Sequence, residues 1–157
     1  MSGKLTPALD ELIRCLAFLP GVGPKSATRM ALNILERHQD QGAQLAIAIG
    51  NALEKVQRCR RCNNFSEQDI CQICADPRRE STLLCVVESA TDVVAIEQTS
   101  VFRGRYFVLM GHLSPIDGIG AKEIGVDKLQ KLLAGNKEIL ELILATGATL
   151  EGETTAH

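Results

Sequence analysis

The sequence predicts a multidomain α+β protein, with a helical N-terminal region, a cysteine-rich segment and a C-terminal α/β region built on a parallel sheet. Apolar residues recur at helical spacing over the first third of the chain. Two CxxC pairs follow within a short irregular segment. From residue 83 onward, apolar runs typical of buried strands alternate with helical patterns. We expect three domains, formed by residues 1–56, 57–76 and 77–157.

Three helices are expected at the N-terminus, over about residues 5–18, 24–37 and 43–57. The second helix carries apolar residues on one face, namely Ala27, Met30, Ala31, Ile34 and Leu35. Two further cysteines, Cys15 and Cys85, lie on apolar faces of their segments, so both are expected to be small core residues.

The stretch LPGVGPKSATRMA, residues 19–31, has the glycines, lysine and serine of a phosphate-binding loop but not their order. Only one residue separates its two glycines, Pro24 replaces the glycine that would precede Lys25, and a helix rather than a strand comes before it. Two helices joined by the tight turn PGVG instead indicate a helix-hairpin-helix unit, in which Pro24 suits the first helical position.

The start of this second helix is a candidate DNA-binding site. Its free backbone amides and the helix dipole favour an anion, Lys25 adds a positive charge, and Arg29 lies one turn further along the same face. Such a unit can bind phosphate groups without reading bases. The alternative is a helical hairpin whose glycines only allow close packing, with both basic side chains in solvent.

The cysteine segment CRRCNNFSEQDICQIC carries the strongest signal in the chain. Two CxxC pairs, eight residues apart, supply the four thiolates of a closed structural zinc site, through Cys59, Cys62, Cys71 and Cys74. The alternatives are two disulfides or unrelated buried cysteines, although a cytosolic chain disfavours disulfides. The nearby arginines, Arg58, Arg60 and Arg61, are expected to offset the negative charge of the site or to contact a partner.

The C-terminal region is expected to contain strands at 83–88, 105–110 and 140–146, with helices over TDVVAIEQ and VDKLQKLLA between them. Ser89 or Thr91 lies near the start of the first of these helices. The loop GHLSPIDGIGAKE, which follows the second strand, is rich in turn-forming residues.

Charge is distributed unevenly along the chain. The net charge is −2, yet residues 1–37 carry five basic and three acidic side chains, whereas residues 81–157 carry six basic and ten acidic ones. Any nucleic acid is therefore expected to bind the N-terminal part. The sequence has no membrane-spanning run and no leader pattern, so we expect a cytoplasmic protein, associated with the nucleoid if it binds DNA.

The motifs together resemble those of the bacterial RecR family of recombination mediators. LPGVGPKSATRMA, the cysteine segment, CVVESATDVVAIEQT and GRYFVLMGHLSPIDGIG occur in the family's order and spacing, and the match extends from residue 5 to about 156. The resemblance implies a helix-hairpin-helix, a four-cysteine zinc finger that holds one structural Zn²⁺, and a Toprim domain. It also assigns DNA contact to Lys25 and Arg29.

The family is non-enzymatic, and the resemblance therefore implies DNA repair by recombination without catalysis. Family members act with RecO and RecF to load RecA onto single-stranded or gapped DNA, and they assemble as dimers and ring-shaped tetramers. The remaining alternatives are a zinc-stabilised scaffold without DNA binding and a Toprim-type enzyme.

The enzyme alternative depends on three carboxylates. Glu88 ends the first expected strand, and Glu151 and Glu153 follow the third, so they are expected to converge at one edge of the sheet and could hold Mg²⁺. No aspartate pair follows the third strand, and the one tyrosine, Tyr106, lies in a strand. We therefore expect this surface, with His112 as a further candidate, to contact a protein partner such as RecO.

The chain departs from the family pattern in two places. Gly147 and Ala148 stand where relatives commonly have Asn and Pro, which bears on the Toprim surface. The sequence also ends earlier than is usual, before the segment that completes the Toprim sheet in relatives and contributes to assembly. We therefore expect residues 81–157 to be loosely packed or stabilised by a partner subunit, with apolar surface exposed on residues 83–88 or on residues 142–146 and an unpaired sheet edge beside it.

Overall fold

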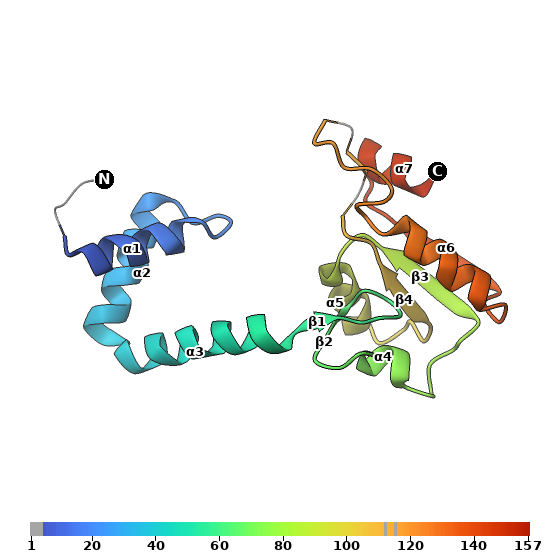
Figure 1. The fold of residues 1–157 in the computed structure, drawn as a ribbon, viewed down its shortest axis with the longest axis horizontal. Helices are drawn as coiled ribbons and strands as arrows, with labels where there is room; N and C mark the ends of the chain where they lie inside the picture. Colours follow the sequence, from blue (N-terminus) through green and yellow to red (C-terminus); the bar gives the residue numbers. More distant parts are fainter. Residues whose placement is uncertain (1–4, 112, 115) are drawn as a thin grey trace. The chain divides into compact units, whose positions relative to one another are not determined.

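The computed structural model describes residues 5–111, 113–114 and 116–157 of the chain (Figure 1). The chain divides into two compact units, Met1–Lys55 and Val56–His157. The cysteine segment therefore belongs to the same unit as the α/β region. Within the described part of the chain, no helix combines the length and apolarity that a membrane crossing requires.

The first unit contains α1 (Pro7–Ala17), α2 (Pro24–Arg37) and α3 (Gln39–Lys55). Thr6 caps α1 by accepting a hydrogen bond from the Leu9 amide at 3.2 Å, and each of the first two helices begins with a proline, as suits the first helical position. Helices α1 and α2 pack together, with the small residues Ala27 and Ala31 buried.

Two expectations for this unit are wrong. Cys15 is exposed rather than part of the core, because its face of α1 is not the one that packs. Helix α3 starts at Gln39 rather than near residue 43, because the helix continues through Gly42. A Cβ at Gly42 would lie 2.5 Å from Ile34 Cγ2, so glycine permits the close approach of α2 and α3 at this point.

The second unit begins with the cysteine segment. Strands β1 (Gln57–Arg58) and β2 (Phe65–Ser66) pair antiparallel and are followed by the short helix α4 (Gln72–Ala75). The chain then forms β3 (Leu83–Val87), α5 (Ala90–Gln98), β4 (Arg105–Val108), α6 (Val126–Gly135), β5 (Glu141–Ala145) and α7 (Leu150–Ala156). The three longer strands form a parallel sheet of order β4-β3-β5, which confirms the predicted α+β fold with a parallel sheet.

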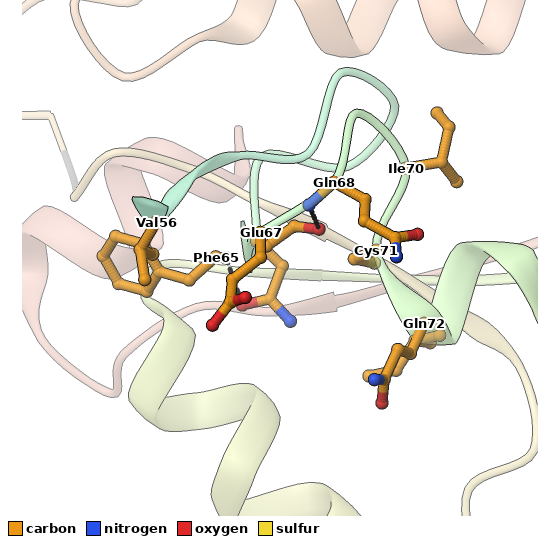
Figure 2. A pocket seen from close by; sticks show the side chains of 10 residues that line it. Val56, Phe65, Glu67, Gln68, Ile70, Cys71 and Gln72 are labelled. Atoms are coloured by element: carbon orange, nitrogen blue, oxygen red, sulfur yellow. Dashed lines mark hydrogen bonds between the residues drawn. The ribbon is translucent and has the colours of Figure 1, made fainter. Parts of the chain in front are cut away.

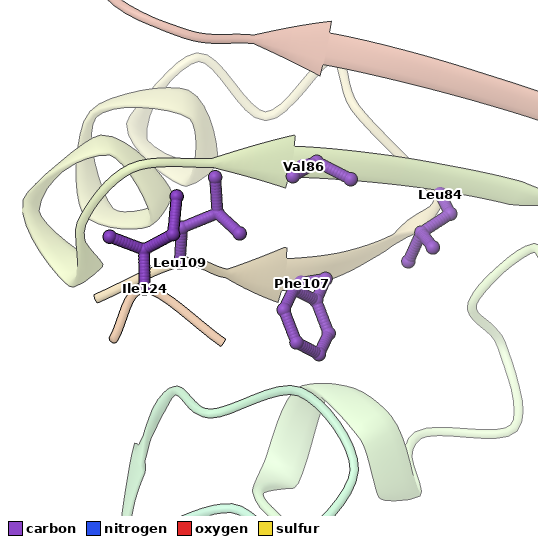
Figure 3. Packing of buried hydrophobic residues seen from close by; sticks show 5 residues of the cluster. All are labelled: Leu84, Val86, Phe107, Leu109 and Ile124. Atoms are coloured by element: carbon purple, nitrogen blue, oxygen red, sulfur yellow. The ribbon is translucent and has the colours of Figure 1, made fainter. Parts of the chain in front are cut away.

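Both faces of the central strand β3 are covered, as its continuous apolar run predicts. One face contributes Leu84 and Val86 to a core with Phe107, Leu109 and Ile124 (Figure 3), against which apolar residues of α6 pack. The other face places Cys85 and Val87 against α5, together with Tyr106, Val108 and Val93. Cys85 is thus a core residue, as expected.

Side-chain caps set the starts of two helices in this unit. Ser89 and Asp92 form a capping box at α5, in which the Asp92 carboxylate accepts hydrogen bonds of 3.0 Å from the Ser89 amide and hydroxyl. Thr149 caps α7 by accepting a hydrogen bond from the Gly152 amide at 3.0 Å. The first turn of α7 carries Glu151 and Glu153, where the helix dipole favours negative charge.

Strand β5 forms one edge of the sheet and leaves apolar side chains in solvent. Leu142 is 41% exposed and Leu144 is 46% exposed, whereas every residue of β3 after Leu83 is buried. Within the described residues β5 pairs with β3 alone. An edge strand with an exposed apolar face is poorly protected against opening.

We expect backbone amides of β5 to exchange with solvent faster than those of β3, because β3 is hydrogen-bonded on both sides and β5 on one. Hydrogen exchange read by mass spectrometry on a monomer verified by sedimentation measures this difference. Equally slow exchange over residues 83–87 and 141–145 would show that the sheet is stable without further cover.

Candidate zinc centre and nucleic-acid interface

Four cysteines gather at one point of the second unit. The Sγ atoms of Cys59, Cys62, Cys71 and Cys74 all lie within 4.8 Å of one another, and the four residues are between 0% and 6% exposed. Cys62 Sγ and Cys71 Sγ are 3.6 Å apart, well beyond the roughly 2.05 Å of a disulfide bond. All four cysteines are free, so they are not paired in disulfides, and their arrangement fits a closed tetrahedral zinc site.

Backbone amides around the cysteines favour the thiolate form of their side chains. The amides of Asn64, Cys71 and Cys74 donate hydrogen bonds of 3.3 to 3.4 Å to cysteine sulfurs. Such bonds favour the charged form of an acceptor sulfur. All four positions are occupied by cysteine, so the site has no open place for a substrate or a reactive water, and its zinc is structural.

Without metal, the buried thiols must share their protons. The hydrogen bond with Cys71, together with burial, raises the pKa of the Cys62 thiol, while the hydrogen bond from Cys62 lowers the pKa of Cys71. A bound Zn²⁺ makes these opposite pKa shifts irrelevant, because it stabilises all four thiolates and displaces their protons.

One neighbouring arginine contacts the loop of the first cysteine pair: Arg58 Nη1 donates to the Asn63 carbonyl oxygen at 3.0 Å. Arg58 stacks its guanidinium 4.1 Å from the centre of the Phe65 ring, and Arg61 donates to Asn136 Oδ1 at 3.3 Å. A further cation at this loop is Lys128, whose Nζ donates to the Cys59 carbonyl oxygen at 3.2 Å. Sequence reasoning missed Lys128 because 69 residues separate it from Cys59.

A pocket of about 520 Å³ lies beside the cysteine segment (Figure 2). Its walls include the side chains of Val56, Phe65, Gln68 and Ile70, and Cys71 is its one zinc ligand. The residues around it mix apolar and amide groups and include one charged side chain, Glu67. This lining contains no assembled acid, base and nucleophile.

The start of α2 presents the features of an anion site. Gly23 caps the helix without a side-chain hydrogen bond, and the first intrahelical bond to it comes from the Ala27 amide. Pro24 has no amide, and those of Lys25 and Ser26 precede that first bond, so they are free to bind a ligand. A concavity is lined by residues of this first turn and the next, namely Pro24, Lys25, Ser26, Thr28 and Arg29.

The two basic side chains predicted for DNA contact lie at this helix start. Lys25 and Arg29 are both exposed, and neither forms a salt bridge with any residue that the structure describes. Their positive charges are therefore not neutralised within the described chain, and each is available to a phosphate.

The two glycines of the hairpin, Gly21 and Gly23, are explained by different features of the structure. Gly21 has φ +79°, a left-handed conformation that favours glycine. Gly23 has φ −84°, which any residue adopts, and a Cβ there would meet no atom within 4 Å. Close packing inside the chain therefore does not explain Gly23, whereas close approach of an external backbone would.

The three carboxylates are not assembled into a metal site. Among the described residues, the cysteines form the one group of three or more metal-ligating side chains close enough to share an ion. Glu151 and Glu153 are two residues apart on α7, and side chains at this spacing do not face each other. A metal site made by these two carboxylates and Glu88 is thus not found among the described residues, and His112 lies outside them.

Glu88 nevertheless has an unusual setting. Its Oε1 atom is buried and has no hydrogen-bond partner among the described residues. A Cβ at Gly147 would lie 3.3 Å from Glu88 Oε2, so the chain after β5 passes beside this carboxylate. Any side chain at position 147 would therefore contact Glu88 directly.

Family models match almost the whole chain in three consecutive parts. The model described as RecR, helix-hairpin-helix matches residues 9–53, the RecR four-cysteine zinc finger domain matches residues 56–76, and the Toprim domain matches residues 82–157. The comparisons thus confirm the predicted order of helix-hairpin-helix, four-cysteine zinc finger and Toprim domain.

Curated relatives are similar over the full chain. The sequence is 65% identical over 157 residues to recombination protein RecR of Hahella chejuensis, and the match covers 100% of this chain and 78% of that protein. It is 54% identical over 153 residues to recombination protein RecR of Psychrobacter cryohalolentis, where the match covers 98% of this chain and 77% of the relative.

Proposed function

Because the chain belongs to the RecR family of recombination proteins, we propose that it is a non-enzymatic mediator that binds DNA without sequence preference through the start of α2. One observation carries the DNA assignment. The uncapped start of α2 places free amides beside two exposed basic side chains, Lys25 and Arg29, that no described acidic group neutralises. This combination suits the phosphate groups of a nucleic acid backbone.

The proposed contact reads the backbone and not the bases. Helix amides and lysine or arginine side chains hold phosphates in any sequence, because phosphates carry no sequence information. Gly23 adds a position at which another backbone can approach without a Cβ in between. Affinity at one such site is modest and falls with salt, so several copies of the chain on one DNA molecule would bind far more tightly.

We further propose that the protein works with RecO and RecF in the nucleoid, and that it brings RecA to single-stranded or gapped DNA. The family membership supports these partners. The Toprim surface that contains Glu88, Glu151 and Glu153 is the proposed contact for RecO. Its carboxylates are not grouped as a metal site among the described residues, which favours protein contact over phosphoryl transfer.

A DNA-binding titration of the intact chain tests the proposed function. Fluorescently labelled single-stranded and gapped DNA would be titrated at two salt concentrations, with and without RecO. We expect weak binding of the chain alone, stronger binding with RecO, and loss of affinity as salt rises. Absence of binding by both DNAs at both salt concentrations, with and without RecO, would leave a zinc-stabilised scaffold as the better description.

Self-association is a further part of the proposal, and α3 supports it. No residue of this 17-residue helix is buried, and its central part, from Gln41 to Leu53, contains no charged side chain. Its exposed apolar residues include Leu45, Ile47, Ile49 and Leu53, the last of which is 81% exposed. An uncharged apolar helix surface of this kind marks a protein interface, and we propose a second copy of the chain as the partner.

Placing a charge on α3 should weaken this self-association. We expect Ile49→Lys to raise the dissociation constant of self-association at least tenfold, because an unpaired charge at an apolar interface must lose its hydration. Sedimentation velocity over a concentration series measures the shift. Glu54→Lys, which changes a charge at the end of the same helix, is the control, and a parental dissociation constant for Ile49→Lys would exclude this surface.

A further inference from the structure

The zinc-binding segment is held to the α/β region by a lysine of α6. Lys128 Nζ donates to the carbonyl oxygen of Cys59 at 3.2 Å and also to Oδ1 of Asn63, the residue that directly follows Cys62. Both contacts are partly buried. One side chain thus contacts the loop of the first cysteine pair at both ends.

The position of Lys128 in its helix is otherwise unfavourable. It is the third residue of α6, where the positive end of the helix dipole disfavours a cation. Gly125, the cap of this helix, provides no side-chain hydrogen bond that would offset the effect. Asp127 in the same turn offsets part of this effect, and the Cys59 carbonyl oxygen and Asn63 Oδ1 accept hydrogen bonds from the cation.

The backbone conformation and burial of Asn63 suit its contact with Lys128. Its backbone is left-handed, with φ +65°, and its backbone amide donates to the Cys59 carbonyl oxygen at 3.0 Å. The side chain is buried, and its Nδ2 has no hydrogen-bond partner among the described residues. A Cβ at Gly125 would lie 3.3 Å from this Nδ2, so the glycine leaves room for the asparagine beside α6.

The same loop also contacts the sheet. The Val108 amide of the edge strand β4 donates to the Cys62 carbonyl oxygen at 2.8 Å. Arg61 donates to Asn136 at the end of α6. The first cysteine pair therefore has fixed contacts to β4 and to both ends of α6, and a change in the loop is transmitted to these elements.

We infer that Lys128 is a positioning residue for the zinc site: with Asn63, it holds the first cysteine pair in its metal-binding conformation and couples zinc occupancy to the structure of α6. Its charge adds to that of Arg58, which donates to the Asn63 carbonyl oxygen, in offsetting the −2 charge of a zinc ion bound by four thiolates. This inference does not depend on the proposed DNA binding.

Zinc retention of the full chain tests the inference. A chromogenic zinc chelator would be added to zinc-loaded parent protein, Lys128→Met and Lys131→Met, and the release of zinc followed. We expect Lys128→Met to bind zinc at least tenfold more weakly, the effect typical of removing a residue that supports metal ligands. Lys131, exposed one turn along the same helix, is the control with the same change of charge and should retain parental affinity within about twofold.

Two further variants separate positioning from general stability. Lys128→Arg keeps the charge and should recover most of the affinity, whereas Asn63→Gly tolerates the left-handed backbone but removes Oδ1 and should weaken zinc binding as Lys128→Met does. Because Lys128 and Asn63 contact each other, their effects on zinc affinity should not be independent. The fold-loss of zinc affinity in the double variant should be smaller than the product of the fold-losses in the two single variants. If Lys128→Met does not fold, Asn63→Gly decides the question.

Hydrogen exchange provides a readout that metal affinity alone does not. Removal of zinc from the parent protein should speed exchange in the first turn of α6, residues 126–129. In Lys128→Met this turn should already exchange faster and respond less to zinc. Parental zinc affinity in both Lys128→Met and Asn63→Gly, or an α6 that does not respond to zinc in the parent protein, would overturn the inference.

Discussion

Protein carrying Cys62→Ser should retain less than half an equivalent of zinc and lose most of the stability of its second unit. Metal binding at a four-cysteine site contributes about 10 to 16 kcal/mol in zinc-finger peptides, and a whole domain is stable by only about 5 to 15 kcal/mol. The cysteines are buried within the unit that contains the sheet, and the Cys62 carbonyl oxygen accepts a hydrogen bond from β4. Loss of the metal should therefore destabilise the sheet as well as the loop.

Elemental analysis of the purified protein, prepared without chelator and with thiols reduced, measures zinc per chain, and thermal unfolding followed by circular dichroism measures stability. Cys15→Ser is the matched control, because Cys15 is exposed and outside the cluster. Parent protein with under half an equivalent of zinc would contradict the assignment. So would Cys62→Ser protein with the zinc content and melting temperature of the parent.

Alanine at Lys25 or Arg29 should weaken DNA binding equally for all sequences. Each side chain neutralises about one phosphate in the proposed complex, so each substitution should reduce the slope of log affinity against log salt by about 1, and the double substitution by about 2. The folding of α2 should be unaffected, because both side chains are exposed and form no salt bridge with a described residue.

Fluorescence anisotropy over a series of salt concentrations measures these slopes. Arg37→Ala, at the opposite end of α2, is the control, since it removes the same charge far from the helix start. Two DNA sequences of equal length test the independence from sequence. If both single variants bind as well as the parent at low salt, the start of α2 is not the DNA site.

Local patterns in the sequence predicted most of the elements well. The limits of α2 are correct because Pro24 and the hairpin glycines mark its start, and β3 is correct because a short, continuous apolar run is typical of a strand covered on both faces. The zinc ligands were predicted from spacing alone, since two CxxC pairs bring four sulfurs together in few conformations.

Predictions that depended on which face of an element packs were less successful. Cys15 lies on an apolar stretch of α1, but helical spacing does not tell which of several apolar faces meets α2. The carboxylates at 151 and 153 follow the third strand as expected, in the first turn of α7, and whether they meet Glu88 depends on how that helix packs.

The sequence by itself determined the order of elements, the zinc ligands and the basic start of α2, because each depends on residues that are neighbours along the chain or one helical turn apart. Only the tertiary structure decided which cation supports the zinc site, which apolar surfaces stay exposed on α3 and β5, and what surrounds Glu88. These features arise where segments distant in sequence meet, as Lys128 meets Cys59. Such meetings depend on how the helices pack on the sheet, which spacing within one segment does not encode.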